Sequence, residues 1–204
     1  MKICIIGANG MVGKKLVKKI LSSDLYQTQI NKICLFDINF NQTKDNLHLT
    51  HIKGNIEDLT QIKKLASERF DIIFHLAAIV SGEAEENFEK GWNVNLFSMW
   101  QLLEALKTEH FKSSKTYIPK LIFTSSIAVF GSPFPEKIDD EFLCSPQTSY
   151  GAQKASAELL ISDFSRKGFI NGMSLRLPTI CVRPGLPNKA ASGFFSNIIR
   201  EPLN

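Results

Sequence analysis

The sequence predicts an α/β fold in which helices cover both faces of a doubly wound parallel sheet. Two observations lead to this prediction. Short apolar runs alternate with longer amphipathic stretches along the 204 residues, as expected for repeated strand–helix units. The apolar runs carry few polar interruptions, and strands that are apolar throughout are typical of a parallel sheet buried on both sides.

The predicted strands are short and mostly apolar: they span residues 2–7 (KICIIG), 32–37 (KICLFD), 49–54 (LTHIKG), 71–78 (DIIFHLAA), 120–126 (KLIFTSS) and 173–178 (MSLRLP). The predicted helices repeat apolar residues at helical spacing: they span residues 11–23, 57–69, 84–107, 150–167 and 194–200. Because ligands of open parallel sheets bind at the carboxyl ends of the strands, we expect the functional residues in the loops at that edge.

Composition excludes several classes of function. The formal net charge is +4, without the long basic run that a nucleic-acid partner would favour. No apolar stretch is long enough to cross a bilayer, and Met1 leads directly into an apolar run without a charged leader. We therefore expect a cytoplasmic protein with no nucleic-acid or membrane partner.

The cysteines and histidines indicate neither a disulfide framework nor a metal site. Cys4, Cys34, Cys144 and Cys181 form no CxxC pair, and three of them lie within apolar runs, which suits buried thiols in a reducing compartment. The histidines form no ligand cluster along the chain, so no metal is expected.

The stretch GANGMVG places Gly7, Gly10 and Gly13 between the first predicted strand and the first helix. Glycines in this position allow a tight turn and the close approach of a pyrophosphate to the free N–H groups of the helix start. Asp37 ends the next strand, where a carboxylate accepts ribose hydroxyls and repels a 2′-phosphate. This arrangement predicts a Rossmann-type site for NAD rather than NADP. Asn55 follows the third strand and suits either adenine recognition or a simple turn.

Two further segments carry groups that can transfer a proton. Tyr150 and Lys154 are four residues apart on a predicted helix, and therefore lie on the same face. Ser126 ends the fifth strand at the edge that carries the glycine loop. Each feature alone equally suits a solvent-exposed helix face or a helix cap. Together they predict alcohol oxidation, in which a Tyr150 phenolate favoured by the Lys154 ammonium removes the proton and Ser126 binds the substrate oxygen.

The motifs GANGMVG, HLAA (75–78), FTSSIAVFG (123–131) and YGAQK (150–154) make the chain similar to the extended short-chain dehydrogenase/reductase family, the NAD-dependent epimerase/dehydratase group. The resemblance implies a catalytic triad of Ser126, Tyr150 and Lys154, with both helical residues also contacting the cofactor. It implies that further residues line the cofactor site: Asn9, Met11, Val12, Ile56, Leu76, Ala77, Ala78, Asn95, Pro178 and Ile180.

A narrower resemblance involves HLAAIVSGEAEENFEKG, SPQTSYGAQK and LRLPTICVRPGLPNKAASGFF. These stretches resemble the D-erythronate dehydrogenase subgroup, which oxidises the C2 hydroxyl of a four-carbon sugar acid with NAD. Phe130, where nucleotide-sugar epimerases usually have tyrosine, fits that subgroup. The resemblance implies a substrate site with Ser81, Ser126 and Tyr150. Arg183 suits a carboxylate ligand, although a structural arginine fits equally well.

The resemblance also implies how the chain is divided. We expect a NAD-binding domain over residues 1–178 and the start of a shortened substrate-binding lobe over residues 179–204, with most of that lobe absent. Family members commonly form homodimers through two helices, which here correspond to residues 84–107 and the helix of Tyr150. Two alternatives stay open: a nucleotide-sugar epimerase or dehydratase, and a non-catalytic NAD-binding module.

Overall fold

The computed structural model describes residues 1–24, 28–40, 43–139, 141–182, 189–190 and 192–200. Its six strands form one parallel sheet in the order β3-β2-β1-β4-β5-β6. The strands are β1 (Lys2–Ile6), β2 (Lys32–Asp37), β3 (Leu49–Lys53), β4 (Ile72–His75), β5 (Lys120–Ser126) and β6 (Asn171–Leu177). The helices are α1 (Met11–Leu21), α3 (Leu59–Ser67), α4 (Ser81–Glu86), α5 (Phe88–Trp92), π-helical η1 (Asn93–Phe97), α6 (Ser98–Lys112), 3₁₀-helical η2 (Ile127–Val129), α7 (Ser149–Arg166) and α8 (Gly193–Arg200).

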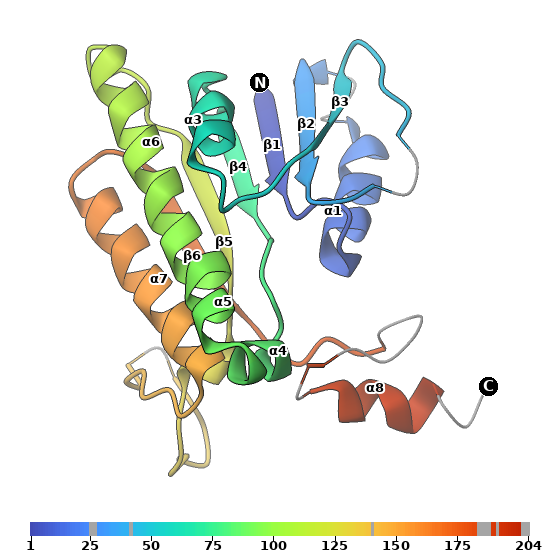
Figure 1. The fold of residues 1–204 in the computed structure, drawn as a ribbon, viewed down its shortest axis with the longest axis vertical. Coiled ribbons are helices and arrows are strands. Elements are labelled where there is room, and N and C mark those ends of the chain that lie inside the picture. Colours follow the sequence, from blue (N-terminus) through green and yellow to red (C-terminus); the bar gives the residue numbers. More distant parts are fainter. Residues whose placement is uncertain (25–27, 41–42, 140, 183–188, 191, 201–204) are drawn as a thin grey trace.

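The strand order reverses beside β1, which pairs with β2 on one side and β4 on the other. Because all strands are parallel, their carboxyl ends lie at one edge, at the lower side of Figure 1, together with α4 and α8. A crevice at such a reversal point is where open α/β sheets bind ligands. The fold therefore places the loops after β1, β2, β4 and β5 around one region.

Helices pack on both faces of the sheet, as predicted. On one face, alternate strand residues such as Ile6, Phe36 and Phe123 form a core with the apolar sides of α3, α6 and α7. On the other face, Ile5 and Leu35 lie in a second core against which α1 packs. Figure 1 shows the long helices α6 and α7 side by side over the first face and α1 on the opposite side. The part of the sheet around β1 and β2 is thus buried between two helical layers.

Three elements differ from the sequence-based prediction. β4 ends at His75 instead of residue 78, because the backbone after it leaves the sheet toward the glycine loop. The single helix predicted for residues 84–107 begins earlier, at Ser81, and is interrupted at Asn87, whose φ of −125° and ψ of 75° are not helical. It then passes through the π-helical turn η1 and continues to Lys112. β6 has no buried residue, whereas a central parallel strand would be buried on both faces.

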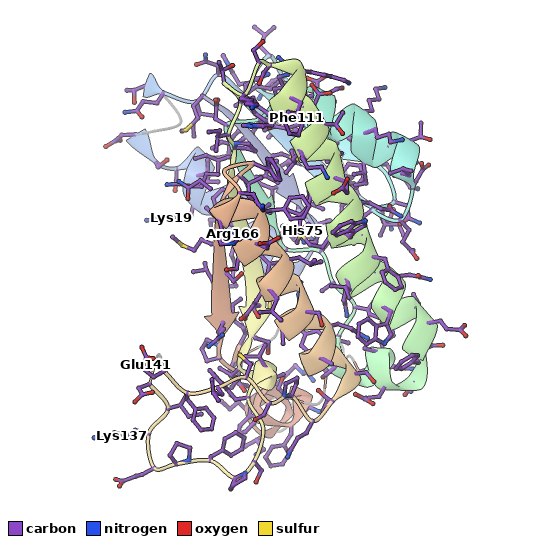
Figure 2. All side chains as sticks on the ribbon, turned by 90° about the vertical axis from the view of Figure 1, so that its left-hand side faces the viewer. Lys19, His75, Phe111, Lys137, Glu141 and Arg166 are labelled. Carbon is purple, nitrogen blue, oxygen red and sulfur yellow. The ribbon has the colours of Figure 1, made fainter. Side chains whose placement is uncertain are left out.

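The loop between η2 and α7 extends away from the sheet, and Figure 2 shows Lys137 and Glu141 on it, pointing outward. Cys4 and Cys34 are buried thiols, as expected, whereas Cys144 and Cys181 are exposed. Within the described ranges, every helix is too short or too polar to cross a membrane.

Candidate active site

The glycine turn brings β1 and α1 close to the loop that follows β4. Gly7 has φ of +87°, and a Cβ there would overlap the Ala77 backbone. A Cβ on Gly13 would overlap the carbonyl oxygens of Gly7 and Ala8. Both positions therefore require glycine. Gly10 caps α1 without a side-chain hydrogen bond, so the N–H groups at Met11, Val12 and Gly13 are left for an anionic ligand.

Asp37 joins the end of β2 to the same turn. Its Oδ2 accepts a hydrogen bond from the Asn9 amide at 2.8 Å, and its Oδ1 accepts a longer one from the Asn39 amide at 3.3 Å. Each carboxylate oxygen has two lone pairs, so acceptor capacity remains on both oxygens. The carboxylate is held in place and can accept further hydroxyl groups.

A cavity of about 510 Å³ runs along this edge of the sheet. Predicted cofactor residues form much of its lining: Gly7, Asn9, Gly10, Asp37, Asn55, Ile56, Leu76, Ala77 and Ala78. Sequence reasoning missed several other lining residues: Phe36, Ile38, Asn39, Gly54, Glu57, Ile79, Lys90 and Val94. Most of these adjoin a predicted residue, so an extension by one or two positions would have found them. Lys90 alone comes from α5, which the sequence gave no reason to place here.

The donor set and the shape of the cavity fit a dinucleotide. A Cβ on Gly10 would meet only the Gly7 carbonyl oxygen among the described atoms, at 3.3 Å, so the approach to the start of α1 stays open. Gly10, which caps α1, and the fixed carboxylate of Asp37 both line the cavity, whereas Met11, Val12 and Gly13 at the start of the helix do not. Apolar residues such as Ile56 and Leu76 form the walls. This pattern suits a pyrophosphate, a ribose diol and flat apolar rings, in that order.

Two residues predicted to contact the cofactor, Asn55 and Asn95, form hydrogen bonds within the protein. Asn55 closes a turn, because its Oδ1 accepts from the Glu57 amide at 3.0 Å, although it still lines the cavity. The contact of Asn95 with the cofactor stays a prediction, because its side chain is engaged with other residues in this structure. Asn95 is 1% exposed and does not line the cavity, because its Oδ1 accepts from the Ile79 amide at 2.9 Å. Its amide nitrogen donates to Gln153 at 2.8 Å.

The start of α7 lies against the turn that follows Ser126. Thr148 caps α7 by accepting from the Gly151 amide at 3.0 Å, which orients the turn of Tyr150. Gly151 is packed so tightly on η2 that a Cβ would overlap the Ala128 carbonyl. The Ser126 Oγ accepts from the Ala128 amide at 3.1 Å and so also caps η2. The structure therefore brings Ser126 and Tyr150 to one short stretch of the sheet edge.

Lys154 reaches this stretch from inside the protein. Its side chain is 1% exposed, and its Nζ donates to the Thr124 carbonyl at 2.9 Å. The same nitrogen lies 4.5 Å from the centre of the Phe123 ring and 5.6 Å from that of the Tyr150 ring. Burial lowers the pKa of Lys154 to about 7, against a smaller opposing effect of the Glu158 carboxylate. A cation placed beside a phenol favours the phenolate, and Tyr150 itself is only half-buried.

His75, in the predicted HLAA motif, is a second buried titratable group. Figure 2 shows it well inside the molecule, and it is 2% exposed. Burial, and then the charge of Lys154, lower its pKa to about 3. The ring is therefore neutral near pH 7, and its Nδ1 has no hydrogen-bond partner among the described residues.

A polar network behind the site was not predicted. Ser125 donates to Glu158, and Glu158 forms a salt bridge with Arg176 at 2.8 Å. Arg176 also donates to the Cys144 sulfur at 3.0 Å. The four-residue spacing of Lys154 and Glu158 on one helix was a signal available in the sequence.

The predicted substrate residues are only partly described. Ser81 begins α4 at the same edge of the sheet. Arg183 lies outside the described residues. Pro178 and Ile180, which were predicted to contact the cofactor, follow β6 but do not line the cavity.

Across the described ranges, histidine, cysteine and carboxylate side chains gather nowhere in a group of three that would hold a metal ion.

Comparisons with known proteins agree with this geometry. The NAD dependent epimerase/dehydratase family matches residues 3–203. D-erythronate dehydrogenases from Haemophilus influenzae and Cupriavidus necator are 42% and 40% identical over the whole chain, which covers 62% and 63% of those proteins. A solved structure described as the nucleoside-diphosphate-sugar epimerase from Agrobacterium tumefaciens is 48% identical with a TM-score of 0.90, over all of this chain and 60% of that one. The chain thus spans about three fifths of the length of these relatives.

Proposed function

Because the chain belongs to the NAD dependent epimerase/dehydratase family, we propose that it forms the cofactor-binding and catalytic part of an NAD-dependent dehydrogenase acting on a four-carbon sugar acid. One observation carries the proposal: Lys154 and the turn of Tyr150 meet the end of β5, at the sheet edge that holds the glycine turn and Asp37. Two relatives that match the whole chain and are named D-erythronate dehydrogenase support the substrate class.

NAD would lie in the cavity between the glycine turn and the loop after β4. The helix amides from Met11 to Gly13 would face its pyrophosphate, and Asp37 would accept its adenosine ribose hydroxyls. A 2′-phosphate at that ribose would meet a carboxylate, which disfavours NADP. When bound, NAD supplies the carbon that accepts a hydride.

The protein residues would handle the proton. Tyr150 would act as the base that takes the proton of the substrate hydroxyl through its phenolate oxygen. The charged form of Lys154 would favour that phenolate, and because the pKa of Lys154 is about 7, this support is strongest near and below pH 7. Ser126 would donate a hydrogen bond to the substrate oxygen and hold it at the sheet edge. We propose that the oxidised position is the C2 hydroxyl, next to the carboxylate, and that Ser81 and Arg183 contact the acid.

We also propose a division of the chain at about residue 178. Residues 1–178 would bind NAD, and residues 179–204 would begin the substrate lobe. In the described part, Lys189 is tied to α4 because its carbonyl accepts from the Gly82 amide at 2.9 Å and its ammonium pairs with Glu86. Lys189 is therefore connected to the helix that begins with Ser81, which supports a substrate site shared by the two parts.

The alternative is a nucleotide-sugar epimerase. The observation that favours it is the similarity to a structure carrying that description. An epimerase would retain the reduced cofactor within each turnover, whereas a dehydrogenase would release NADH. Accumulation of NADH with a sugar acid as the only substrate therefore distinguishes the two.

We further propose a cytoplasmic homodimer that associates through α6 and α7. Trp100 on α6 and Leu159 on α7 are 45% and 73% exposed, and these helices pack against each other. A dimer would cover these apolar side chains. Sedimentation of the protein and of a Leu159→Lys variant tests this: a monomeric wild type contradicts it.

The activity is tested by following NADH formation at 340 nm with a panel of four-carbon sugar acids and nucleotide sugars. A Tyr150→Phe variant should bind NAD normally and lose about two to four orders of magnitude in rate, because the base is removed. Absence of NADH formation by the wild type with every sugar acid contradicts the proposed function. Full activity of Tyr150→Phe contradicts the role of the phenol.

A further inference from the structure

Gln153 lies between the two proposed catalytic residues of α7 yet does not line the cavity. Its side chain is fully buried, and its Oε1 accepts a hydrogen bond from the Asn95 Nδ2 at 2.8 Å. Asn95 belongs to η1, the π-helical turn between α5 and α6. Single π-helical turns inside longer helices frequently mark functional positions. The pair therefore joins the catalytic helix to an irregular turn in the neighbouring helix.

The orientation of both amides is fixed by hydrogen-bond logic. The Ile79 backbone N–H can only donate, so the Asn95 atom 2.9 Å from it must be the oxygen. The Asn95 nitrogen then faces Gln153, and it also lies 3.4 Å from the Ile79 carbonyl. Since that nitrogen can only donate, Gln153 must present its own oxygen. The Ile79 N–H thus fixes the orientation of the Asn95 amide, and the Asn95 amide fixes that of the Gln153 amide.

The far end of this series is the cofactor cavity. Ile79 lines the cavity next to Ala77 and Ala78. The Asn95 side chain accepts a hydrogen bond from the backbone N–H of Ile79 and donates one to its backbone C=O. At the near end, Gln153 precedes Lys154 and follows Tyr150 by three residues. Two buried side chains thus connect the cavity wall with the turn that carries the proposed base.

The surroundings leave little room for Gln153 to move. A Cβ on Gly91 of α5 would lie 2.5 Å from the Gln153 Nε2, so the glycine provides the space that this amide fills. The Nε2 has no hydrogen-bond partner among the described residues. A buried amide with one unsatisfied nitrogen is costly, and an apolar side chain of the same size would avoid that cost. Packing alone therefore does not account for glutamine here.

We propose that Gln153 is a positioning residue that, through Asn95, holds the Tyr150–Lys154 turn in register with the cavity loop at residues 76–79. The proposal rests on the proposed dehydrogenase function for its catalytic consequence. A shift of the turn by a fraction of an ångström would move the base relative to the substrate hydroxyl while leaving the nucleotide contacts at Gly7 and Asp37 in place. Such a shift lowers turnover more than it lowers cofactor affinity.

The test compares Gln153→Met, which keeps the length but removes the acceptor, with Gln153→Glu, which keeps an acceptor for Asn95. Hydrogen–deuterium exchange is measured at the Ile79 amide, together with the dissociation constant for NAD and kcat. We expect Gln153→Met to speed exchange at Ile79 at least tenfold and to lower kcat about tenfold, with the NAD constant changed by less than about threefold. Gln153→Glu should recover most of the protection at Ile79.

Gln101 provides a matched control, because it is a partly buried glutamine on α6 whose Oε1 also lacks a described partner. It lines a groove between α3 and α6. Gln101→Met should change neither Ile79 exchange nor kcat. If Gln153→Met does not fold, Gln153→Asn withdraws the same amide by one methylene and takes its place. The exchange measurement needs no substrate. A wild type without NADH formation therefore counts against the dehydrogenase proposal, whereas an active wild type with unchanged Ile79 exchange in the variant overturns the positioning role.

Discussion

Replacing the buried Lys154 with methionine should stabilise the protein, and the gain should depend on pH. The side chain is 1% exposed, and burial lowers its pKa from 10.5 to about 7. At about 1.4 kcal/mol for each pH unit, this lowering corresponds to about 5 kcal/mol of destabilisation when the amine is charged in both states. Methionine fills a similar volume without a charge.

The sign follows from proton linkage. Between pH 7 and 10.5 the unfolded chain holds the Lys154 proton and the folded chain has released it, so the wild type becomes more stable as the pH rises. The destabilisation from the buried Lys154 is fully present below pH 7 and disappears as the pH rises toward 10.5. At pH 9 it is about 2 kcal/mol, so the advantage of Lys154→Met should shrink by about 2 kcal/mol between pH 7 and 9. His75 does not titrate in this window, because its pKa is lowered to about 3.

The assay is urea unfolding of wild type and variant at pH 7, 8 and 9, with the free energy of unfolding extrapolated to water. The hydrogen bond to Thr124 and the contact with the Phe123 ring are also lost in the variant. The part of these losses that does not depend on the charge of Lys154 is the same at each pH and cancels in the comparison. Lys19→Met is the control, because Lys19 is an exposed lysine on α1 whose side chain reaches into solvent in Figure 2. If the free energy of unfolding of Lys154→Met differs from that of the wild type by the same amount at pH 7, 8 and 9, the reasoning is refuted.

Three further predictions follow from the same site. Glu158→Gln should lower the pKa of Lys154 further, since the Glu158 charge raises it, and this is checked by the pH at which the Lys154 side chain titrates in ¹⁵N NMR. Asp37→Ala should weaken NAD binding about tenfold and reduce discrimination against NADP; calorimetry with both cofactors measures this, and an unchanged preference excludes the ribose contact. Gly13→Ala should cost roughly 2–3 kcal/mol of stability, because its Cβ would overlap the Gly7 carbonyl; a thermal midpoint equal to that of the wild type contradicts this.

Local patterns were enough to predict the sheet. β2 and β5 match the predicted ranges, and α1 begins at the predicted residue. The two strands are mostly apolar runs, and the helix follows the glycine turn directly. The interruption at Asn87 and the π-helical turn after it were not predictable, because an amphipathic period does not report a one-residue change of hydrogen-bond register.

The site shows the same division between local and long-range information. The glycine turn and Asp37 follow from short-range demands on backbone shape and charge, and the structure places them around one cavity. The hydrogen bonds of Asn95 were not predicted, because its partners, Ile79 and Gln153, lie 16 and 58 residues away in the sequence. Contacts of this kind depend on how helices pack, and no pattern along one helix contains them.

The burial of Lys154 supports the proposed catalytic role over a purely structural one. A lysine that only filled space at the end of β5 would be replaced without loss by methionine or leucine, since a buried charge is often less stable than an apolar side chain of similar volume. The surroundings do little to relieve the cost: the described partners are one carbonyl oxygen, two aromatic rings and the more distant Glu158 carboxylate. A phenol beside the cation gains from this arrangement, because a dry cation acts on a neighbouring charge more strongly than a hydrated one. The stability lost at Lys154 and the proton transfer proposed for Tyr150 would therefore have the same physical cause, and Lys154→Met should raise the stability while it removes the proposed activity.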